Sequence, residues 1–321
     1  MNNKIIKSIR KGISFLLTKQ LNSGEFPTTR AKKISMENAS YIKSVFLTTF
    51  VLHSLSQLKN VFPINEIVQN ATKFLLNEEE KGFWRFFGKG THLPLDLDDT
   101  CCALSALFIN GVELEYKTIA DYLLNYRDKR GIFYTWILDC YLPKTSSYFE
   151  NDIDWVINAN TLFFFSLIKM PISEVTNYLC NIIEKEDFED GSIYYYSPFS
   201  FIYCFSRAYA DGGAIGLKPI LRNIKNYLLN KQNGKGKWGN TLENAMATVS
   251  LINCGYKGIV VDGAINNLLK AQKADGGWPN SAFFAGVPEL FYGSRELTTA
   301  IAIEALWKYL EVRKNGYQII F

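Results

Sequence analysis

Three aspartates stand together in the stretch Leu95-Asp96-Leu97-Asp98-Asp99-Thr100, just ahead of an apolar run that predicts a helix. Asp96 and Asp99 have the spacing that caps a helix start, which leaves Asp98 without a capping role. Crowded carboxylates cannot all ionise, so one keeps its proton at neutral pH, and a helix N-terminus stabilises the anion that remains after proton transfer. The pattern predicts a usable acid at Asp98, with a solvated helix start as the alternative.

A second pattern recurs along the chain: a helical stretch that ends in glutamine or a substitute, then a glycine and an aromatic or large apolar residue. Six copies follow one another at a spacing of roughly fifty residues, within the range of helical repeats. The glycine permits a tight turn after a helix, and the aromatic ring can pack against the next unit. Three close copies run over 20–26, 232–238 and 272–278, and weaker ones over 79–84, 127–133 and 178–193.

A more uniformly apolar run follows each copy, and a helix that is apolar all round is buried on all sides. Six outer and six inner helices predict an all-α fold, a closed (α/α)6 barrel of six helix-pair repeats, in one domain over 1–321. We expect essentially no sheet beyond a short hairpin. Units wound alike bring the N-termini of the inner helices to one mouth. The expected inner helices are 38–58, 98–109, 156–168, 198–209, 243–253 and 296–310.

The acidic stretch 96–100 resembles the DxDD-Thr motif of class II terpene cyclases, the group that includes squalene-hopene cyclase, and its lead-in over 82–84 and 93–95 is similar as well. The glutamine–glycine–aromatic copies resemble the QW motif of the same superfamily. In that family the middle aspartate protonates a carbon–carbon double bond or an epoxide and starts a carbocation cascade. The resemblance implies that Asp98 is the catalytic acid, with Asp96 and Asp99 as supporting carboxylates.

The resemblance also implies an enzyme that cyclises a linear isoprenoid. We expect a prenyl diphosphate of sesquiterpene or diterpene size, with the diphosphate retained, because the sequence has no DDxxD motif of the class I enzymes. Protonation itself requires no cofactor, although Mg²⁺ could accompany a diphosphate. Proton loss or water capture would end the cascade.

Aromatic residues make up 15% of the chain, which fits a cavity whose ring faces stabilise a cation. The expected substrate-binding wall comprises Phe87, Trp155, Phe283, Phe284 and Tyr292, although some of the aromatic residues must pack between repeats instead.

Polar residues near the predicted mouth have two interpretations each. Asn158 and Asn160, two apart in an apolar helix, need hydrogen-bond partners and are expected to contact the acid or a polar substrate group. Arg295 could hold a diphosphate, or form a salt bridge with Glu296 or another carboxylate. His92 could polarise Asp98 or lie on the surface.

Composition excludes several other classes. The net charge of +4 is spread out with no Lys/Arg block, so we expect no nucleic-acid partner. No apolar run is long enough for a transmembrane helix. Two histidines and no paired CxxC predict no metal site, and six cysteines without framework spacing predict reduced thiols in a cytoplasmic protein. The cysteines are Cys101, Cys102, Cys140, Cys180, Cys204 and Cys254.

Rival functions and partners remain open at this stage. A glycoside hydrolase on the same barrel would pair Asp98 with Glu243 or Glu296. A non-catalytic or partner-dependent subunit would expose the three aspartates and pack the barrel shut. Class II terpene cyclases usually have two barrels, so a homodimer or a second barrel subunit could complete the site. Peripheral membrane contact could admit an apolar substrate. Some relatives of this barrel depend on zinc, but this chain lacks the histidine ligands that hold the zinc in them.

Overall fold

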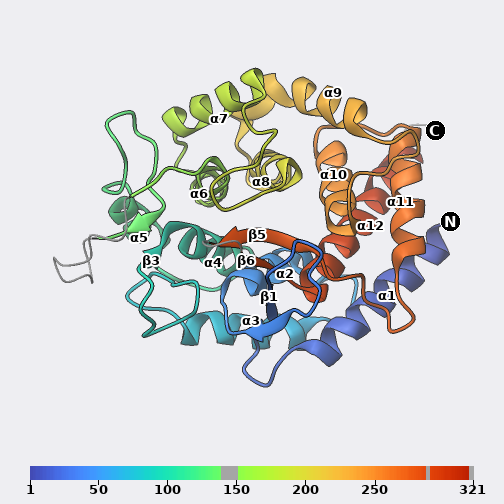
Figure 1. Cartoon of the computed structure of the whole chain (residues 1–321), viewed down its shortest axis with the longest axis horizontal. Coiled ribbons are helices and arrows are strands. Elements are labelled where there is room, and N and C mark those ends of the chain that lie inside the picture. Colours follow the sequence, from blue (N-terminus) through green and yellow to red (C-terminus); the bar gives the residue numbers. More distant parts are fainter. Residues whose placement is uncertain (139–150, 287–289, 318–321) are drawn as a thin grey trace.

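The computed structural model describes residues 1–138, 151–286 and 290–317, and it arranges twelve α-helices in two concentric rings (Figure 1). Each inner helix contacts the next, and the last contacts the first, so the inner ring is closed. This confirms the predicted (α/α)6 barrel. The inner helices are α2 (Phe46–Ser56), α4 (Leu97–Ile109), α6 (Trp155–Leu167), α8 (Pro198–Ala210), α10 (Thr241–Asn253) and α12 (Arg295–Tyr317).

The two rings differ in how their helices are buried. In α3 of the outer ring only Ile67, Ala71, Phe74 and Leu75 are buried, which is the single apolar stripe of a surface helix. In α4 of the inner ring nearly every residue is buried. The other outer helices are α1 (Asn2–Lys19), α5 (Tyr116–Leu123), α7 (Ser173–Lys185), α9 (Leu221–Lys231) and α11 (Ile259–Ala271); α3 spans Asn65–Asn77, and the 3-10 helix η1 (Ile215–Ile220) precedes α9.

The tryptophans of three repeats tie an outer helix to the following inner helix. In three copies the indole N–H of a tryptophan donates to a carbonyl in the last turn of the outer helix. The backbone N–H of the same tryptophan donates to a polar side chain near the start of the inner helix. These partners are Leu75 O and Thr100 for Trp84, Leu228 O and Asn244 for Trp238, and Leu268 O and Thr299 for Trp278.

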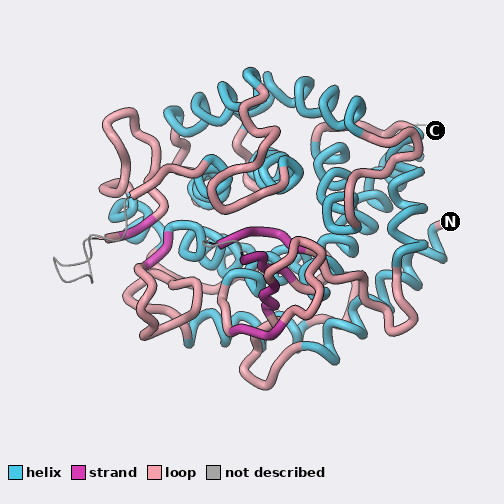
Figure 2. The backbone as a smooth tube through the Cα atoms, in the orientation of Figure 1, coloured by secondary structure: helices cyan, strands magenta, loops and turns pink. Residues whose placement is uncertain are grey.

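The expectation of essentially no sheet is wrong, because strands from both ends of the chain pair with one another (Figure 2). Their antiparallel sheet has the order β2-β1-β6-β5, and β1 pairs with β6 in the register Thr29 to Gly293. The pairing of β1 with β6 joins segments from the two ends of the chain, so it leaves no local signal in the sequence. Because β2 occupies residues expected to be helical, the first inner helix starts at Phe46 instead of residue 38. The strands are β1 (Thr28–Ala31), β2 (Ser40–Ile42), β5 (Ala282–Gly286) and β6 (Leu290–Gly293), with a separate pair of β3 (Leu95–Asp96) and β4 (Trp136–Ile137).

The described residues contain no helix that is both long and apolar enough to cross a membrane. Five cysteines are free thiols: Cys101, Cys102 and Cys204 are buried, and Cys180 and Cys254 are partly buried. Cys140 lies outside the described residues.

The turn glycine of the last repeat offers a test of the packing between repeats. Gly276 has φ +92°, and a Cβ there would lie 2.4 Å from the carbonyl oxygen of Lys11. We expect Gly276→Ala to lower the free energy of unfolding by more than the roughly 1–2 kcal/mol of a left-handed residue alone. Gly111→Ala is the matched control, since Gly111 has φ +80° with no atom within 4 Å. Equal losses in urea unfolding of the two variants would contradict the contact.

Candidate active site

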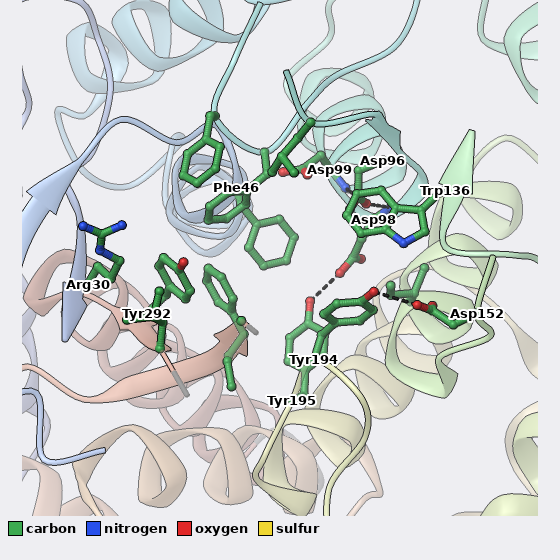
Figure 3. A pocket seen from close by; sticks show the side chains of 18 of the residues that line it. Arg30, Phe46, Asp96, Asp98, Asp99, Trp136, Asp152, Tyr194, Tyr195 and Tyr292 are labelled. Carbon is green, nitrogen blue, oxygen red and sulfur yellow. Dashed lines mark hydrogen bonds between the residues drawn. The ribbon is translucent and has the colours of Figure 1, made fainter. Parts of the chain in front are cut away.

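A cavity of about 670 Å³ opens at the N-terminal ends of the inner helices, within the usual range of ligand sites (Figure 3). Strands β1, β5 and β6 supply one side of its wall, and the starts of α2, α4 and α6 supply the other. The aromatic lining consists of Phe46, Phe86, Phe87, Trp136, Tyr194, Tyr195, Phe284 and Tyr292. The charged or titratable lining consists of Asp96, Asp98, Asp99, Asp152, Arg30 and His92.

The three aspartates occupy the junction between β3 and α4. Asp96 is the N-cap of α4, and its Oδ1 accepts from the backbone N–H groups of Asp98 at 2.6 Å and Asp99 at 3.2 Å. The backbone of Asp96 is itself fixed, because its N–H donates to Trp84 O and β3 pairs with β4. The cap therefore needs only Asp96, and Asp98 is free to turn into the cavity.

Asp98 is 5% exposed and is held by side chains from two other segments. The hydroxyl of Tyr195 donates to its Oδ2 at 2.5 Å, and the amide of Asn160 donates to its Oδ1 at 2.7 Å. Burial, with a smaller contribution from the charge of Asp154, raises the pKa of Asp98 to about 6, against the lowering effects of the two hydrogen bonds and of the charge of Arg207. A carboxyl with this pKa holds its proton in about a tenth of molecules at pH 7, far more than an ordinary aspartate does, and two donors stabilise the anion after transfer.

The flanking carboxyls cannot both be charged beside an ionised Asp98. Burial, and then the charge of Asp98, raises the pKa of Asp96 well above its ordinary value. Burial, and then the charges of Asp96 and Asp98, does the same for Asp99, whose Oδ1 is buried without a hydrogen-bond partner. Asp96 accepts two backbone N–H bonds, which favour its ionised form over that of Asp99. The arrangement keeps the total negative charge at this site low.

A second carboxylate faces the cavity beside the acid. Asp152 accepts a hydrogen bond from the hydroxyl of Tyr194 at 2.7 Å and another from Thr135, and it lines the wall next to Trp136 (Figure 3). Asp152 does not cap α6, because Asp154 is the N-cap of that helix.

The structure places the predicted binding residues differently from one another. Phe87, Phe284 and Tyr292 line the cavity as expected, and His92 lies at the wall with its ring 6.4 Å from that of Phe87. Phe283 lies behind the wall, fully buried with its ring edge-on to Tyr195 at 5.4 Å.

Three other predicted residues lie outside the cavity wall that the described residues form. Trp155 is the first residue of α6 and is half-buried there. Asn158 bonds through its amide to both backbone groups of Phe133, so it fixes a repeat turn. Arg295 also holds a repeat turn, as its guanidinium donates to Trp278 O and Asp275 and stacks 4.7 Å from the ring of Phe15. The side chains of Asn158 and Arg295 are therefore committed to other partners.

Several residues of the site were missed by sequence reasoning. Arg30 reaches the cavity from β1, a strand that the helical periodicity hides. Trp136 reaches the cavity from β4, which is another strand that the helical periodicity does not reveal. Tyr195 is different: the register of the repeats places the cluster 194–196 at the mouth of the barrel, and only the contact of Tyr195 with Asp98 was not predicted, because it depends on the closure of the barrel.

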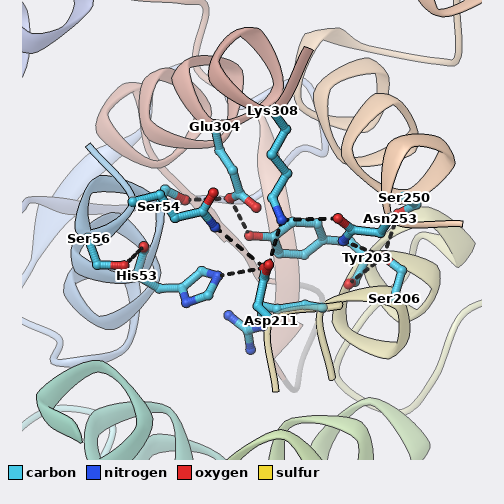
Figure 4. Close-up of polar contacts among 12 residues, drawn as sticks. His53, Ser54, Ser56, Tyr203, Ser206, Asp211, Ser250, Asn253, Glu304 and Lys308 are labelled. Atoms are coloured by element: carbon cyan, nitrogen blue, oxygen red, sulfur yellow. Dashed lines mark hydrogen bonds and ion pairs between the residues drawn. The ribbon is translucent and has the colours of Figure 1, made fainter. Parts of the chain in front are cut away.

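A separate polar cluster lies near the C-terminal ends of inner helices, with His53 in the last turn of α2 and Asp211 at the C-cap of α8 (Figure 4). His53, Asp211 and Glu304 offer atoms within 4.8 Å of one another that could hold a metal ion. The ammonium of Lys308, however, already lies 2.6 Å from Asp211 Oδ1 and lowers the pKa of that carboxyl, against the effect of burial. A divalent ion would have to displace a lysine there, so the cluster is better described as a buried ion pair with neighbours.

Comparison with known proteins shows the fold. No protein-family model and no curated protein sequence matches the chain. The solved structure of the type II terpene cyclase MstE from Scytonema is similar with a TM-score of 0.78 and 16% identity, over 97% of this chain and 99% of that one. Another MstE structure, of a variant, contains its substrate geranylgeranyl dihydroxybenzoate.

Two further structures share the architecture. The ent-copalyl diphosphate synthase of Streptomyces platensis matches with a TM-score of 0.58 and 18% identity, and this chain covers 50% of its length. An unsaturated glucuronyl hydrolase specific for heparin matches over 98% of this chain with a TM-score of 0.66 and 11% identity. The barrel is thus shared by proteins of different chemistry, and the site residues must decide between them.

The raised pKa of Asp98 predicts a pH-dependent contribution to stability. Between the ordinary pKa of 3.8 and the folded pKa of about 6, the unfolded chain ionises Asp98 while the folded protein keeps it protonated, so stability falls as the pH rises over this range. Relative to Asp98→Asn, the unmodified protein should lose about 2.4 kcal/mol between pH 4 and pH 7.5, at 1.36 kcal/mol per pKa unit. Urea unfolding of both proteins at the two pH values measures this, and a constant difference would contradict it.

Proposed function

We propose that the protein is a class II-type terpene cyclase in which Asp98 protonates an alkene of a linear isoprenoid. The observation that carries this is one buried carboxyl with a raised pKa, held by Tyr195 and Asn160, at the wall of an aromatic cavity. The alkene π electrons form the new C–H bond, the other alkene carbon becomes a cation, and the carboxylate remains. Internal alkenes then attack the cation in turn, until proton loss or water capture ends the cascade.

The cavity wall suits the cation that this reaction creates. The ring of Phe284 is stacked on Tyr292 at 5.0 Å and meets Phe46 and Phe86 edge-on at 5.3 and 5.4 Å. Each ring face that a cation meets stabilises it by about 0.5–2 kcal/mol. The same rings exclude water and can hold a prenyl chain in a folded conformation.

The position of Arg30, at the side of the cavity opposite Asp98, favours a substrate with an anionic head group. Arg30 and Tyr292 lie across the cavity from Asp98 (Figure 3). The described wall has this one guanidinium against four aspartates, so a diphosphate would be only partly neutralised and would need Mg²⁺ as well. We therefore propose a prenyl chain with an anionic head group at Arg30. A carboxylate head group would need fewer cations to neutralise it than the diphosphate predicted from the resemblance.

The single barrel can serve as the whole catalytic unit. MstE is matched over 99% of its chain by this one barrel, which supports a pocket closed by β1, β5 and β6 without a second barrel. The glycoside hydrolase alternative lacks the partner predicted for Asp98, which was Glu243 or Glu296. Glu243 is held in the capping box of α10 with Asn240 and accepts from Ser197, and neither Glu243 nor Glu296 belongs to the described wall. A non-catalytic subunit with exposed aspartates does not fit their burial.

A product screen tests the proposal. Unmodified protein is incubated, with and without Mg²⁺, with geranylgeranyl diphosphate, farnesyl diphosphate, a prenylated hydroxybenzoate and squalene, and extracts are analysed by gas chromatography–mass spectrometry before and after phosphatase treatment. We expect a cyclic product that Asp98→Asn fails to make, with a loss of at least about 10²-fold because a positioned acid contributes about 10²–10⁴-fold. Full activity of Asp98→Asn would refute the mechanism.

The head-group assignment makes its own prediction. Arg30→Met should raise the KM for a substrate with an anionic head group by about tenfold or more, since a hydrogen bond to a charged group contributes about 1.5–3 kcal/mol. A prenyl alcohol of the same chain length is the control substrate, and its KM should change little. Equal effects on both substrates would show that Arg30 does not bind the head group.

A further inference from the structure

Arg207 is a buried cation that the proposed reaction does not itself require. It lies on α8 with 2% of its surface exposed, and its guanidinium carbon is 4.6 Å from the ring centres of Phe50 and Phe163. Its Nη2 donates to Asn160 Oδ1 at 2.6 Å. A buried charge is expensive unless it is paired, so this position calls for a reason beyond packing.

The contact with Arg207 decides which way the amide of Asn160 points. A guanidinium can only donate hydrogen bonds, so the oxygen of the Asn160 amide must face Arg207. The NH₂ group then has to face Asp98, where it donates to Oδ1 at 2.7 Å. Without Arg207 the amide could rotate and present its oxygen to the carboxyl. An acceptor there would leave the anion formed by proton transfer without one of its two donors.

The charge of Arg207 needs a counterion other than Asp98, because Asp98 must hold a proton in order to act. Glu304 on α12 supplies one: it is fully buried, and its Oε2 accepts from the hydroxyls of Ser54 and Tyr203, each at 2.8 Å. The Tyr203 ring that bonds Glu304 also lies 5.6 Å from the guanidinium carbon of Arg207. Burial lowers the pKa of Arg207, and the negative charge of Glu304 acts in the opposite direction together with larger contributions from Cys204, Tyr203 and Cys102.

We propose that Arg207 is a positioning residue for the acid: it orients the Asn160 amide toward Asp98, while Glu304, from the opposite end of the barrel, balances its charge. This rests on the proposed function for its catalytic consequence. The other charged groups around Asp98 are Asp96, Asp99, Asp152 and Asp154, all acidic. Beyond Glu304, the charges of Asp211 and Lys308 cancel in their ion pair, and His53 lies beside them.

The test reads the protonation state of Asp98 without turnover. Infrared titration follows the carboxyl band that disappears in Asp98→Asn. Arg207 lowers the pKa of Asp98, so Arg207→Met should move the titration midpoint to higher pH, by on the order of one unit. Glu304→Gln should move it to lower pH, because Arg207 then acts on Asp98 uncompensated. Arg295→Met is the matched control, since that arginine holds a surface repeat turn, and its midpoint should not move.

The double variant Arg207→Met/Glu304→Gln keeps the net charge of the barrel and covers the case in which Arg207→Met fails to fold. We expect its kcat to fall at least about tenfold with little change in KM, because the donor to Asp98 is no longer fixed. A kcat equal to that of the unmodified protein would overturn the positioning role, as would a midpoint in Arg207→Met that stays or moves to lower pH. Failure of the unmodified protein to form product would refute the proposed function alone, since the infrared titration needs no substrate.

Discussion

The burial of three adjacent carboxyls at one end of a closed helical ring is the constraint on which the site depends. In water these groups would all ionise and could not donate a proton near neutral pH. Desolvation together with mutual repulsion raises the pKa values of these carboxyls. The cap formed by Asp96 leaves Asp98 turned toward the cavity. The barrel makes this burial stable, because the repeat tryptophans tie the outer ring to the inner one around α4.

The polar groups of the barrel interior form a sequence along its axis. Asp98 sits at the open end, Asn160 and Arg207 follow, and Glu304 lies toward the closed end. Aromatic rings surround the guanidinium, so its charge is only weakly screened and acts on both carboxyls. In the proposed mechanism Asp98 must hold a proton although an arginine lies nearby, and the carboxylate of Glu304, well separated from the cavity, would carry the compensating charge.

The four-stranded sheet supplies the positively charged side of the cavity. Strands from the two ends of the chain close over the N-terminal ends of the inner helices and bring Arg30, Phe284 and Tyr292 to the wall. The acid therefore comes from the helical repeats and the cation from the sheet.

The sequence by itself determined the repeat architecture and the acid. The evidence for both consists of local patterns: apolar runs that differ between outer and inner helices, turn glycines at regular spacing, and three aspartates ahead of α4. Such patterns can be recognised from neighbouring residues alone, without knowledge of the fold. The tertiary structure decided the rest of the site. Asn158 and Asn160 look alike in the sequence, yet one bonds a repeat turn and the other bonds Asp98, because helical rotation points them to different neighbours. Arg30 replaced Arg295 as the cavity cation for a similar reason: pairing of β1 with β6 depends on contacts between chain ends that no local periodicity encodes.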